Sequence, residues 1–333
     1  MNIADRLKRF GIDSYMAMLI GTVVLATVLP ASGAWAGAIK TVSLLAVALL
    51  FFLYGAKLDG ASVIAGIANW RLQVIILGTT FVAFPLLGLG LSAVLSPWLP
   101  ASIVLGLLFL AILPSTVQSS IAFTAMAQGN VAAAVCAASL SNVVGVVLTP
   151  VLAAFVLHTG AGGIRGDAVL SIAMQILLPF ALGQIARRWI GGWVARHKPF
   201  TLFVDRGAIL LIVYTAFSAG MVAGVWQRVD GMTLAIMAAA VALLLATVML
   251  GTTWIGRVAG LPEADRLALL FCGSTKSLAS GVPMAAILFA GQPVSLIILP
   301  LMIYHQAQLF VCAIIAQRRR AAILTGNAAA ALP

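Results

Sequence analysis

Charged residues are scarce in this chain, and acidic residues are the scarcest of them. Only 8% of the 333 residues are charged, and eight are Asp or Glu, whereas a soluble globular domain carries about 25% charged residues. Hydrophobic residues make up 63% of the chain, and apolar windows of about 20 residues, long enough for a helix to cross a bilayer, recur along it. The sequence therefore excludes a soluble globular fold and predicts an all-α polytopic membrane protein.

The chain also has few cysteines, three in all, and their spacing matches no disulfide or metal-binding pattern. Cys136, Cys272 and Cys312 lie in apolar segments, which matches neither a disulfide framework nor a zinc site. We interpret them as small core residues and expect no metal. The sequence also lacks a phosphate-binding Gly-Lys-Ser/Thr loop, a His-Glu-x-x-His pair and a Gly-x-Ser-x-Gly elbow. We therefore expect neither an enzyme nor a cofactor.

No acidic residue falls deep inside an apolar run. All eight are placed at the ends of these runs or between them: Asp5, Asp13, Asp59, Asp167, Asp205, Asp230, Glu263 and Asp265. One basic residue, Lys276, does lie well inside a run. An ionisable residue within a membrane segment is by default a candidate functional residue.

The apolar runs predict ten membrane spans, at about residues 14–32, 39–57, 72–95, 101–127, 131–157, 168–188, 204–226, 232–255, 264–290 and 293–316. Fifteen of the 19 basic residues fall at the span ends on the side of the N-terminus, and three (Lys40, Arg165, Arg228) at the opposite ends. Because cytoplasmic ends carry the excess of Lys and Arg, we expect both termini in the cytoplasm and a location in the plasma membrane, or the inner membrane of a bacterium. The net charge of +11 therefore reflects basic residues at span ends, next to the lipid bilayer. It does not indicate binding to nucleic acid.

Two of the spans are interrupted by polar residues in matching positions. The fourth contains "ILPSTVQSSIAFTAMAQGN" and the ninth "LFCGSTKSLASGVPMAAILFAGQ". Each has a Ser-Thr pair after an apolar half, then small and polar residues, a second apolar half and a glycine. The two spans are five apart, so each would belong to a five-span half, and the halves would have opposite topology. Interrupted helices at matching positions of inverted repeats indicate a transporter binding site. We expect a first repeat over residues 1–157, a second over 168–320 and a frayed cytoplasmic tail over 321–333.

The interruption of the fourth span supplies hydroxyls and an amide. Pro114 breaks the helix, and the free N–H groups of the following half-helix would point toward the break. We assign Thr116 and Gln118 as candidate substrate-binding residues. Four residues are candidate ligands of a cation: Ser115, Ser119, Ser120 and, from the fifth span, Asn142. For any one of these residues, ordinary hydrogen bonding between helices is the alternative.

The tenth span carries a second polar cluster, in "PLMIYHQAQLF". Tyr304 and Gln308 share a helix face because they are four residues apart, and His305 and Gln308 are also neighbours. We assign all three as candidate substrate-binding residues. His305 titrates near neutrality and is suited to relaying protons; the alternative is a histidine bonded to a neighbouring helix.

Lys276 lies in the interruption of the ninth span, with Ser274, Thr275 and Ser277 beside it. A charged side chain at the bilayer centre costs about 2.5–3.5 kcal/mol, and no carboxylate is near in sequence. One interpretation is a cation that lines a cavity and binds substrate together with its three neighbours. The other is a lysine that extends toward the interface or donates to carbonyls freed by the broken helix.

These stretches together resemble the bile acid:sodium symporter superfamily, over residues 10–320. The chain is most similar to the branch typified by the seventh member of solute carrier family ten and its bacterial relatives. The resemblance rests on "LPSTVQSSIAFTAMAQGNVAAAV", "FCGSTKSLASGVPM" and "PLMIYHQAQLF". It implies ten helices in two inverted five-helix repeats, arranged as a panel domain and a core domain, with the broken fourth and ninth helices crossing near the midplane.

The resemblance also implies two sodium sites at that crossing, and here the chain departs from the family pattern. The family has Pro-Gly-Gly-x-x-Ser-Asn in the fourth helix; this chain keeps Pro114 and Ser119 but has Ser120 in place of the asparagine. The family glutamate of the ninth helix is absent, and Lys276 stands nearby. Two like charges about 4 Å apart repel by roughly 4 kcal/mol at an effective dielectric of 20. Lys276 therefore replaces one sodium ion, pairs with an anionic substrate or cycles a proton, and the coupling ion is Na⁺ or H⁺.

We therefore expect a secondary transporter of an organic anion that works by alternating access. A regulatory or scaffold membrane protein with the same fold is the alternative. A channel is disfavoured because the sequence has no motif that would form a selectivity ring.

Overall fold

The computed structural model describes residues 14–57, 69–156, 166–224, 227 and 229–324. Within these residues the chain is helical and contains no strand. Six helices are long and apolar enough to cross a membrane, and all of them are longer than 24 residues: Gly33–Lys57, Trp70–Leu95, Val131–Val156, Lys198–Val222, Gly231–Val258 and Val294–Ile323. The chain is thus a multi-pass membrane protein, as its composition predicts.

Several sequence predictions fall outside the described residues. These concern Asp5, Arg6, Lys8, Arg9, Asp13, Asp59, Arg165, Arg228 and the tail over 325–333. The tail predicted over 321–333 overlaps the last helix, α15 (Val294–Leu324), at residues 321–324, and the rest of it lies outside the described residues.

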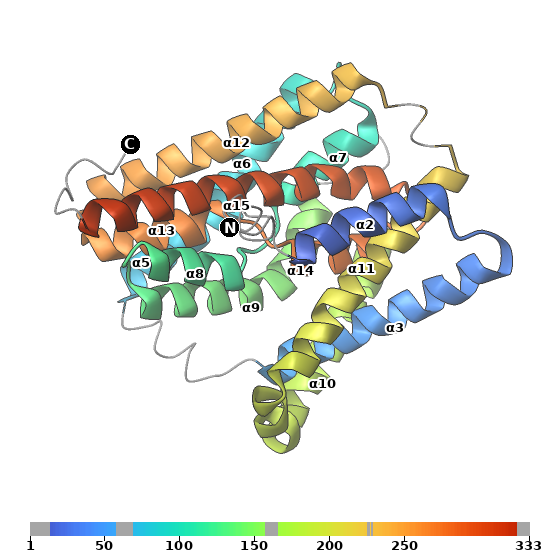
Figure 1. Ribbon diagram of the computed structural model, residues 1–333, viewed down its shortest axis with the longest axis horizontal. Coiled ribbons are helices and arrows are strands. Elements are labelled where there is room, and N and C mark those ends of the chain that lie inside the picture. Colours follow the sequence, from blue (N-terminus) through green and yellow to red (C-terminus); the bar gives the residue numbers. More distant parts are fainter. Residues whose placement is uncertain (1–13, 58–68, 157–165, 225–226, 228, 325–333) are drawn as a thin grey trace, which may run out of the picture.

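The helices form two groups that pack mainly within themselves. The first helix group contains α2 (Ser14–Val28), α3 (Gly33–Lys57), α10 (Gly166–Arg196) and α11 (Lys198–Val222). The second helix group contains α5 (Trp70–Gly78), η2 (Thr79–Ala83), α6 (Phe84–Leu95), α7 (Ala101–Ala111), α8 (Gln118–Met126), α9 (Val131–Val156), α12 (Gly231–Val258), α13 (Glu263–Ser274), α14 (Leu278–Leu288) and α15. In Figure 1, α3, α10 and α11 extend to the lower right, whereas α12, α13 and α15 lie at the upper left. The groups meet where α10 and α11 contact α9, α14 and α15.

Both predicted interruptions are present. The run over 101–127 consists of α7 and α8, separated by residues 112–117, and the run over 264–290 consists of α13 and α14, separated by residues 275–277. Proline and the Ser-Thr pair explain the first break, since proline removes a backbone donor and hydroxyls compete for the backbone. Each break therefore divides one apolar run into two short helices.

A third irregularity occurs between α5 and α6, where one turn is a π-helix. The Phe84 N–H donates to Thr79 O, five residues earlier, rather than four. In this pattern the next donor would be residue 85, but Pro85 has no N–H. The carbonyl of Thr80 is thereby left for a partner outside its own helix.

The outer surface is apolar in the way that a bilayer requires. Large hydrophobic side chains such as Trp35, Phe155 and Phe203 are more than 70% exposed, and a soluble protein would not present so many of them to water. The buried core is also apolar, with Phe51, Leu107 and Phe271 fully enclosed. Polar side chains are concentrated between these two apolar zones, around the helix breaks.

Two glycines bring α3 and α10 into backbone contact. A Cβ atom on Gly183 would lie 1.9 Å from Phe52 O, and a Cβ on Gly55 would lie 2.1 Å from Phe180 O. Small residues at such positions are what allow membrane helices to pack closely. The first helix group depends on this contact for its geometry.

We expect Gly183→Ala to destabilise the protein by about 1–3 kcal/mol, because the added methyl group forces the two backbones apart. The measurement is the melting temperature of the purified protein in detergent. Gly251→Ala is the matched control: its Cβ would meet nothing within 4 Å, and alanine favours a helix over glycine by about 1 kcal/mol. Equal melting temperatures for the two variants would contradict this account of the packing.

Candidate functional site

The two helix breaks cross each other inside the second helix group. The Ser277 N–H donates to Pro114 O at 2.9 Å, and the hydroxyls of Ser115 and Thr275 lie 3.0 Å apart. Residues 160 or more positions apart in the chain thus share hydrogen bonds at the crossing. The predicted meeting of the two interrupted spans is confirmed by these contacts.

Side chains from neighbouring helices satisfy the backbone groups that the breaks set free. Thr149 donates to Ile112 O at 2.9 Å, Asn142 donates to Ser115 O at 2.9 Å, and Tyr304 donates to Ser274 O at 2.7 Å. Non-helical backbone at membrane depth requires such partners because lipid offers none. These polar side chains therefore hold the crossing together.

Lys276 provides the largest share of this compensation. Its side chain is fully buried, and its Nζ donates to Thr80 O at 2.9 Å, Ala111 O at 2.9 Å and Leu113 O at 2.7 Å. An ammonium group has three donors and no acceptor, so these three carbonyls use it completely. The face of the Phe84 ring, 3.9 Å from Nζ, completes the enclosure.

The predicted cluster on α15 holds the backbone of Lys276 rather than its side chain. Gln308 accepts from the Lys276 N–H at 2.7 Å and donates to its carbonyl at 2.9 Å. The Nδ1 atom of His305 lies 2.9 Å from Gln308 Nε2 and 3.4 Å from Lys276 O. Tyr304, His305 and Gln308 therefore fix the extended segment between α13 and α14.

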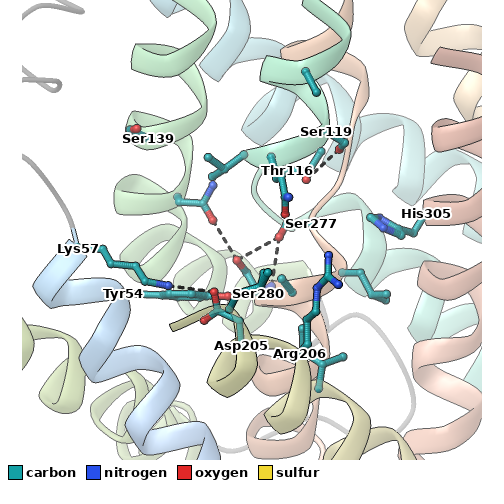
Figure 2. Close-up of a pocket in the computed structure, with 18 of the residues that line it drawn as sticks. Tyr54, Lys57, Thr116, Ser119, Ser139, Asp205, Arg206, Ser277, Ser280 and His305 are labelled. Atoms are coloured by element: carbon teal, nitrogen blue, oxygen red, sulfur yellow. Dashed lines mark hydrogen bonds and ion pairs between the residues drawn. The ribbon is translucent and has the colours of Figure 1, made fainter. Parts of the chain in front are cut away.

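A cavity of about 660 Å³ lies between the two helix groups, on one side of the crossing. The second helix group lines it with the start of α8, through Thr116, Gln118 and Ser119, and with the start of α14, through Ser277 and Ser280. Figure 2 shows these hydroxyls at the centre, with His305 at the side. The first helix group lines the opposite wall.

The N-termini of two short helices reach this cavity. The first turn of α8 has no side-chain cap within the described structure, so the N–H groups of this turn lack intrahelical acceptors. α14 differs because its N-cap, Ser277, accepts from the Ser280 N–H at 3.1 Å. Free N–H groups and the positive end of the helix dipole favour an anion at the start of α8.

The charged side chains of the cavity come from the first helix group, and the sequence analysis missed them. Lys57 donates to Asp205 Oδ2 at 2.9 Å, linking α3 to α11, and Arg206 and Tyr54 line the same wall. Figure 2 shows Lys57 and Tyr54 to the left of Ser280, and Asp205 and Arg206 below it. In the sequence, Lys57, Asp205 and Arg206 stand at the ends of predicted spans, and their spacing gives no indication that they meet. With two basic side chains and one acidic side chain, this wall carries a net positive charge.

The predicted site residues divide between the cavity wall and the packed crossing. Those that line the cavity are Thr116, Gln118, Ser119, Asn142, Ser277 and His305. Those that lie in the crossing and do not line it are Ser115, Ser120, Ser274, Thr275, Lys276, Tyr304 and Gln308. Of the two interpretations of Lys276, the structure matches the second: the side chain does not line the cavity but donates to carbonyls of Thr80, Ala111 and Leu113, which the irregular turns leave free.

The four candidate cation ligands are already engaged with protein groups. Ser119 donates to Thr116 Oγ1 at 3.1 Å, Ser120 donates to Thr116 O, and Asn142 Oδ1 accepts from Ser280 at 2.9 Å. None of the four is a carboxylate, and the described residues contain no cluster of His, Cys, Asp and Glu that could hold a metal ion. A sodium ion at these residues would have only neutral oxygens as ligands.

Comparison with known proteins gives a consistent family. The model of the SBF-like CPA transporter family matches residues 13–321. The chain is 43% identical over 311 residues to the putative symporter YfeH of Escherichia coli, covering 92% of each chain. It is 31% identical over 319 residues to the sodium/bile acid cotransporter 7 of Rattus norvegicus, covering 93% of this chain and 92% of that one. An uncharacterized protein of Pseudomonas aeruginosa is 50% identical over 313 residues, 93% of each chain.

We expect Lys276→Met to lower the free energy of unfolding by about 3 kcal/mol or more, because it leaves three buried carbonyls without a donor. Thermal unfolding in detergent measures the loss. Lys40→Met, on the exposed side of α3, is the matched control and should unfold like the unmodified protein. If Lys276→Met were as stable as the control, the ammonium would not hold the crossing together.

Proposed function

The chain belongs to the SBF-like CPA transporter family, and from this premise we propose that it is a secondary transporter that moves an organic anion by alternating access. The observation that carries the proposal is the cavity between the two helix groups, where the start of α8 and the start of α14 meet. Its volume of about 660 Å³ lies within the range of about 300–1,000 Å³ that small-molecule sites occupy. A solute in this position contacts both groups at once.

The two helix groups are the bodies that move in this proposal. The first group is held together by the glycine contact of α3 and α10, and the second by the hydrogen bonds of the crossing. The main contacts between the groups, among the described residues, are those of α10 and α11 with α9, α14 and α15. Rocking one group against the other would open the cavity to one side of the membrane and then to the other.

This division supports the finer architecture that we also propose, ten spans in two inverted five-helix repeats. The first repeat would run from α2 to α9 and the second from α10 to α15. In this pairing α2 corresponds to α10 and α3 to α11, and these helices pack reciprocally, α3 on α10 and α2 on α11. The broken pairs α7–α8 and α13–α14 would then be equivalents. The first helix group would be the panel domain and the second the core domain.

The cavity favours an anionic solute for two independent reasons. Lys57 and Arg206 give its wall more positive than negative side chains, and the uncapped start of α8 presents N–H groups. Thr116, Gln118 and Ser119 add polar groups that would orient the solute. Both termini would lie in the cytoplasm of a plasma membrane or bacterial inner membrane, because the basic span ends gather on that side.

Lys276 has a different role in this proposal from the one that the sequence first indicated. Three carbonyls at 2.7–2.9 Å surround its Nζ, as carbonyls surround a bound metal cation. A neutral amine has only two N–H donors, so the protonated form alone satisfies all three acceptors. We propose that Lys276 is a resident cation that replaces one coupling sodium ion and does not contact the solute.

Transport is tested by counterflow in proteoliposomes loaded with unlabelled taurocholate, an organic anion of the class proposed. Labelled taurocholate should accumulate transiently and saturably. Ala122→Trp, which fills the cavity at α8, should reduce uptake more than tenfold, since a blocked site cannot be occupied. Ala235→Trp, on the exposed face of α12, should retain it. Uptake that does not saturate, or that ignores Ala122→Trp, would contradict the proposal.

The resident cation is tested by the melting temperature of the protein in sodium chloride against choline chloride. A ligand that binds only the folded state raises the melting temperature with its occupancy. We expect no sodium-specific rise up to about 200 mM sodium, a concentration at which a site with a dissociation constant of about 20 mM would be about 90% occupied and would stabilise the protein. A sodium-specific rise that Ser119→Ala removes would show a surviving sodium site and contradict this role of Lys276.

A further inference from the structure

Asp205 is the single carboxylate among the described residues that line the cavity. It lies on α11, two turns from the start of the helix, and forms the ion pair with Lys57. Both side chains remain accessible from the cavity, with exposed fractions of 31% for Lys57 and 21% for Asp205. Figure 2 shows the pair on the wall that faces the hydroxyls of the crossing.

The two oxygens of this carboxylate have different surroundings. Oδ2 accepts from Lys57 Nζ at 2.9 Å, whereas Oδ1 is buried and has no hydrogen-bond partner among the residues that the structure describes. An ionised carboxylate accepts hydrogen bonds at both oxygens, and a buried acceptor without a donor is unfavourable. A proton on the carboxyl group would relieve this, because the negative charge on the unpartnered oxygen disappears.

Asp205 also pairs with one of the two cations of this wall, Lys57, which an anionic solute would contact. While the carboxylate is ionised, Lys57 is neutralised within the wall. A second anion placed beside Lys57 would meet the negative charge of Asp205 at short range. The anion and the ionised carboxylate therefore compete for one ammonium group, and protonation of the carboxylate ends the competition.

We propose that Asp205 is the proton-binding site that couples solute transport to a proton gradient, an inference that rests on the proposed function. A proton from the aqueous phase adds to the Asp205 carboxylate as the anion binds to Lys57. Lys57 remains an ammonium group throughout. Release of the anion on the other side lets Asp205 return its proton to water and pair again with Lys57. One proton accompanies one anion, and the charge of the pair is zero before and after.

Other charged or titratable groups face the same space. α3 contributes Tyr54 beside Lys57, α11 contributes Arg206, and α15 contributes His305. Among the lining residues, α2, α10 and α14 contribute only apolar or hydroxyl side chains. His305 is the competing proton carrier, but its Nδ1 atom is engaged by Gln308 at 2.9 Å. Asp205 differs from it because it lies against the cation that the anion needs.

The first test is the affinity of the purified protein for taurocholate as a function of pH, measured by isothermal titration. Taurocholate is a sulfonate and stays ionised over the whole pH range of the titration. Any change of its affinity with pH must therefore come from a titrating group of the protein. The apparent dissociation constant should rise about tenfold per pH unit once Asp205 is mostly ionised, because only the protonated fraction binds. In Asp205→Asn the constant should stay low and flat, since an amide is never ionised.

Asp230→Asn is the matched control, because it makes the same change at an exposed helix N-cap whose bond to the Thr233 N–H an asparagine retains. It should show the slope of the unmodified protein. A slope that persists in Asp205→Asn, or one that His305→Gln alone removes, would overturn the proposal. Failure of the unmodified protein to bind taurocholate at any pH would contradict the proposed function instead.

The second test separates coupling from movement. In proteoliposomes that are acidic outside, the unmodified protein should accumulate taurocholate above the external concentration. Asp205→Asn should lose this accumulation and retain counterflow exchange, because the solute still crosses but no proton is obliged to accompany it. Accumulation driven by the proton gradient in Asp205→Asn would overturn the proposal. Loss of counterflow as well, in a variant that still binds taurocholate, would overturn it by assigning Asp205 a structural role.

Discussion

A helix that stops inside a membrane leaves carbonyl oxygens that lipid cannot satisfy, and the whole centre of this molecule is arranged around that constraint. One ammonium group satisfies three of them: Lys276 ties together Thr80, Ala111 and Leu113. Each of these acceptors is free for a local reason, a π-turn followed by proline in one case and the break after α7 in the others. The burial of a lysine is thus the consequence of three backbone irregularities meeting at one point.

One side of the crossing is packed against other side chains, and the other side faces the cavity. Lys276 is enclosed on the packed side with Phe84 and Tyr304. There its charge holds three backbone carbonyls in place, and it does not reach the cavity. On the side that faces the cavity, the N-terminal ends of α8 and α14 lie opposite the charged wall formed by the first helix group. The hydrogen bonds of Lys276 thus hold the crossing together away from the cavity. The residues that would contact a solute in the proposed function line the cavity instead, so the cavity can stay open while the crossing stays packed.

Local signals in the sequence were enough to predict the helical membrane fold and both helix breaks, since apolar run length and Pro114 act within a few residues. For Lys276 the sequence left two interpretations open, and the structure matches the one in which it donates to carbonyls freed by a broken helix. Which carbonyls these are could not be predicted, because they lie 163 to 196 residues away along the chain. Asp205 was missed for a related reason. It was counted as a span end, whereas α11 begins earlier, at Lys198, and carries it into the cavity. The ten-span inverted repeat stays a prediction.

A cation that is covalently part of the chain differs from a bound ion in one thermodynamic respect: it does not cross the membrane, so it cannot draw energy from an ion gradient. Each coupling ion that travels with a solute multiplies the concentration ratio that the carrier can sustain, and a lysine in place of that ion contributes no such factor. If Lys276 has the role proposed for it, replacing a sodium ion by this lysine would lower the highest concentration ratio that the carrier could sustain. In the proposed role, the same exchange would also make the occupancy of that one position independent of the sodium concentration around the protein.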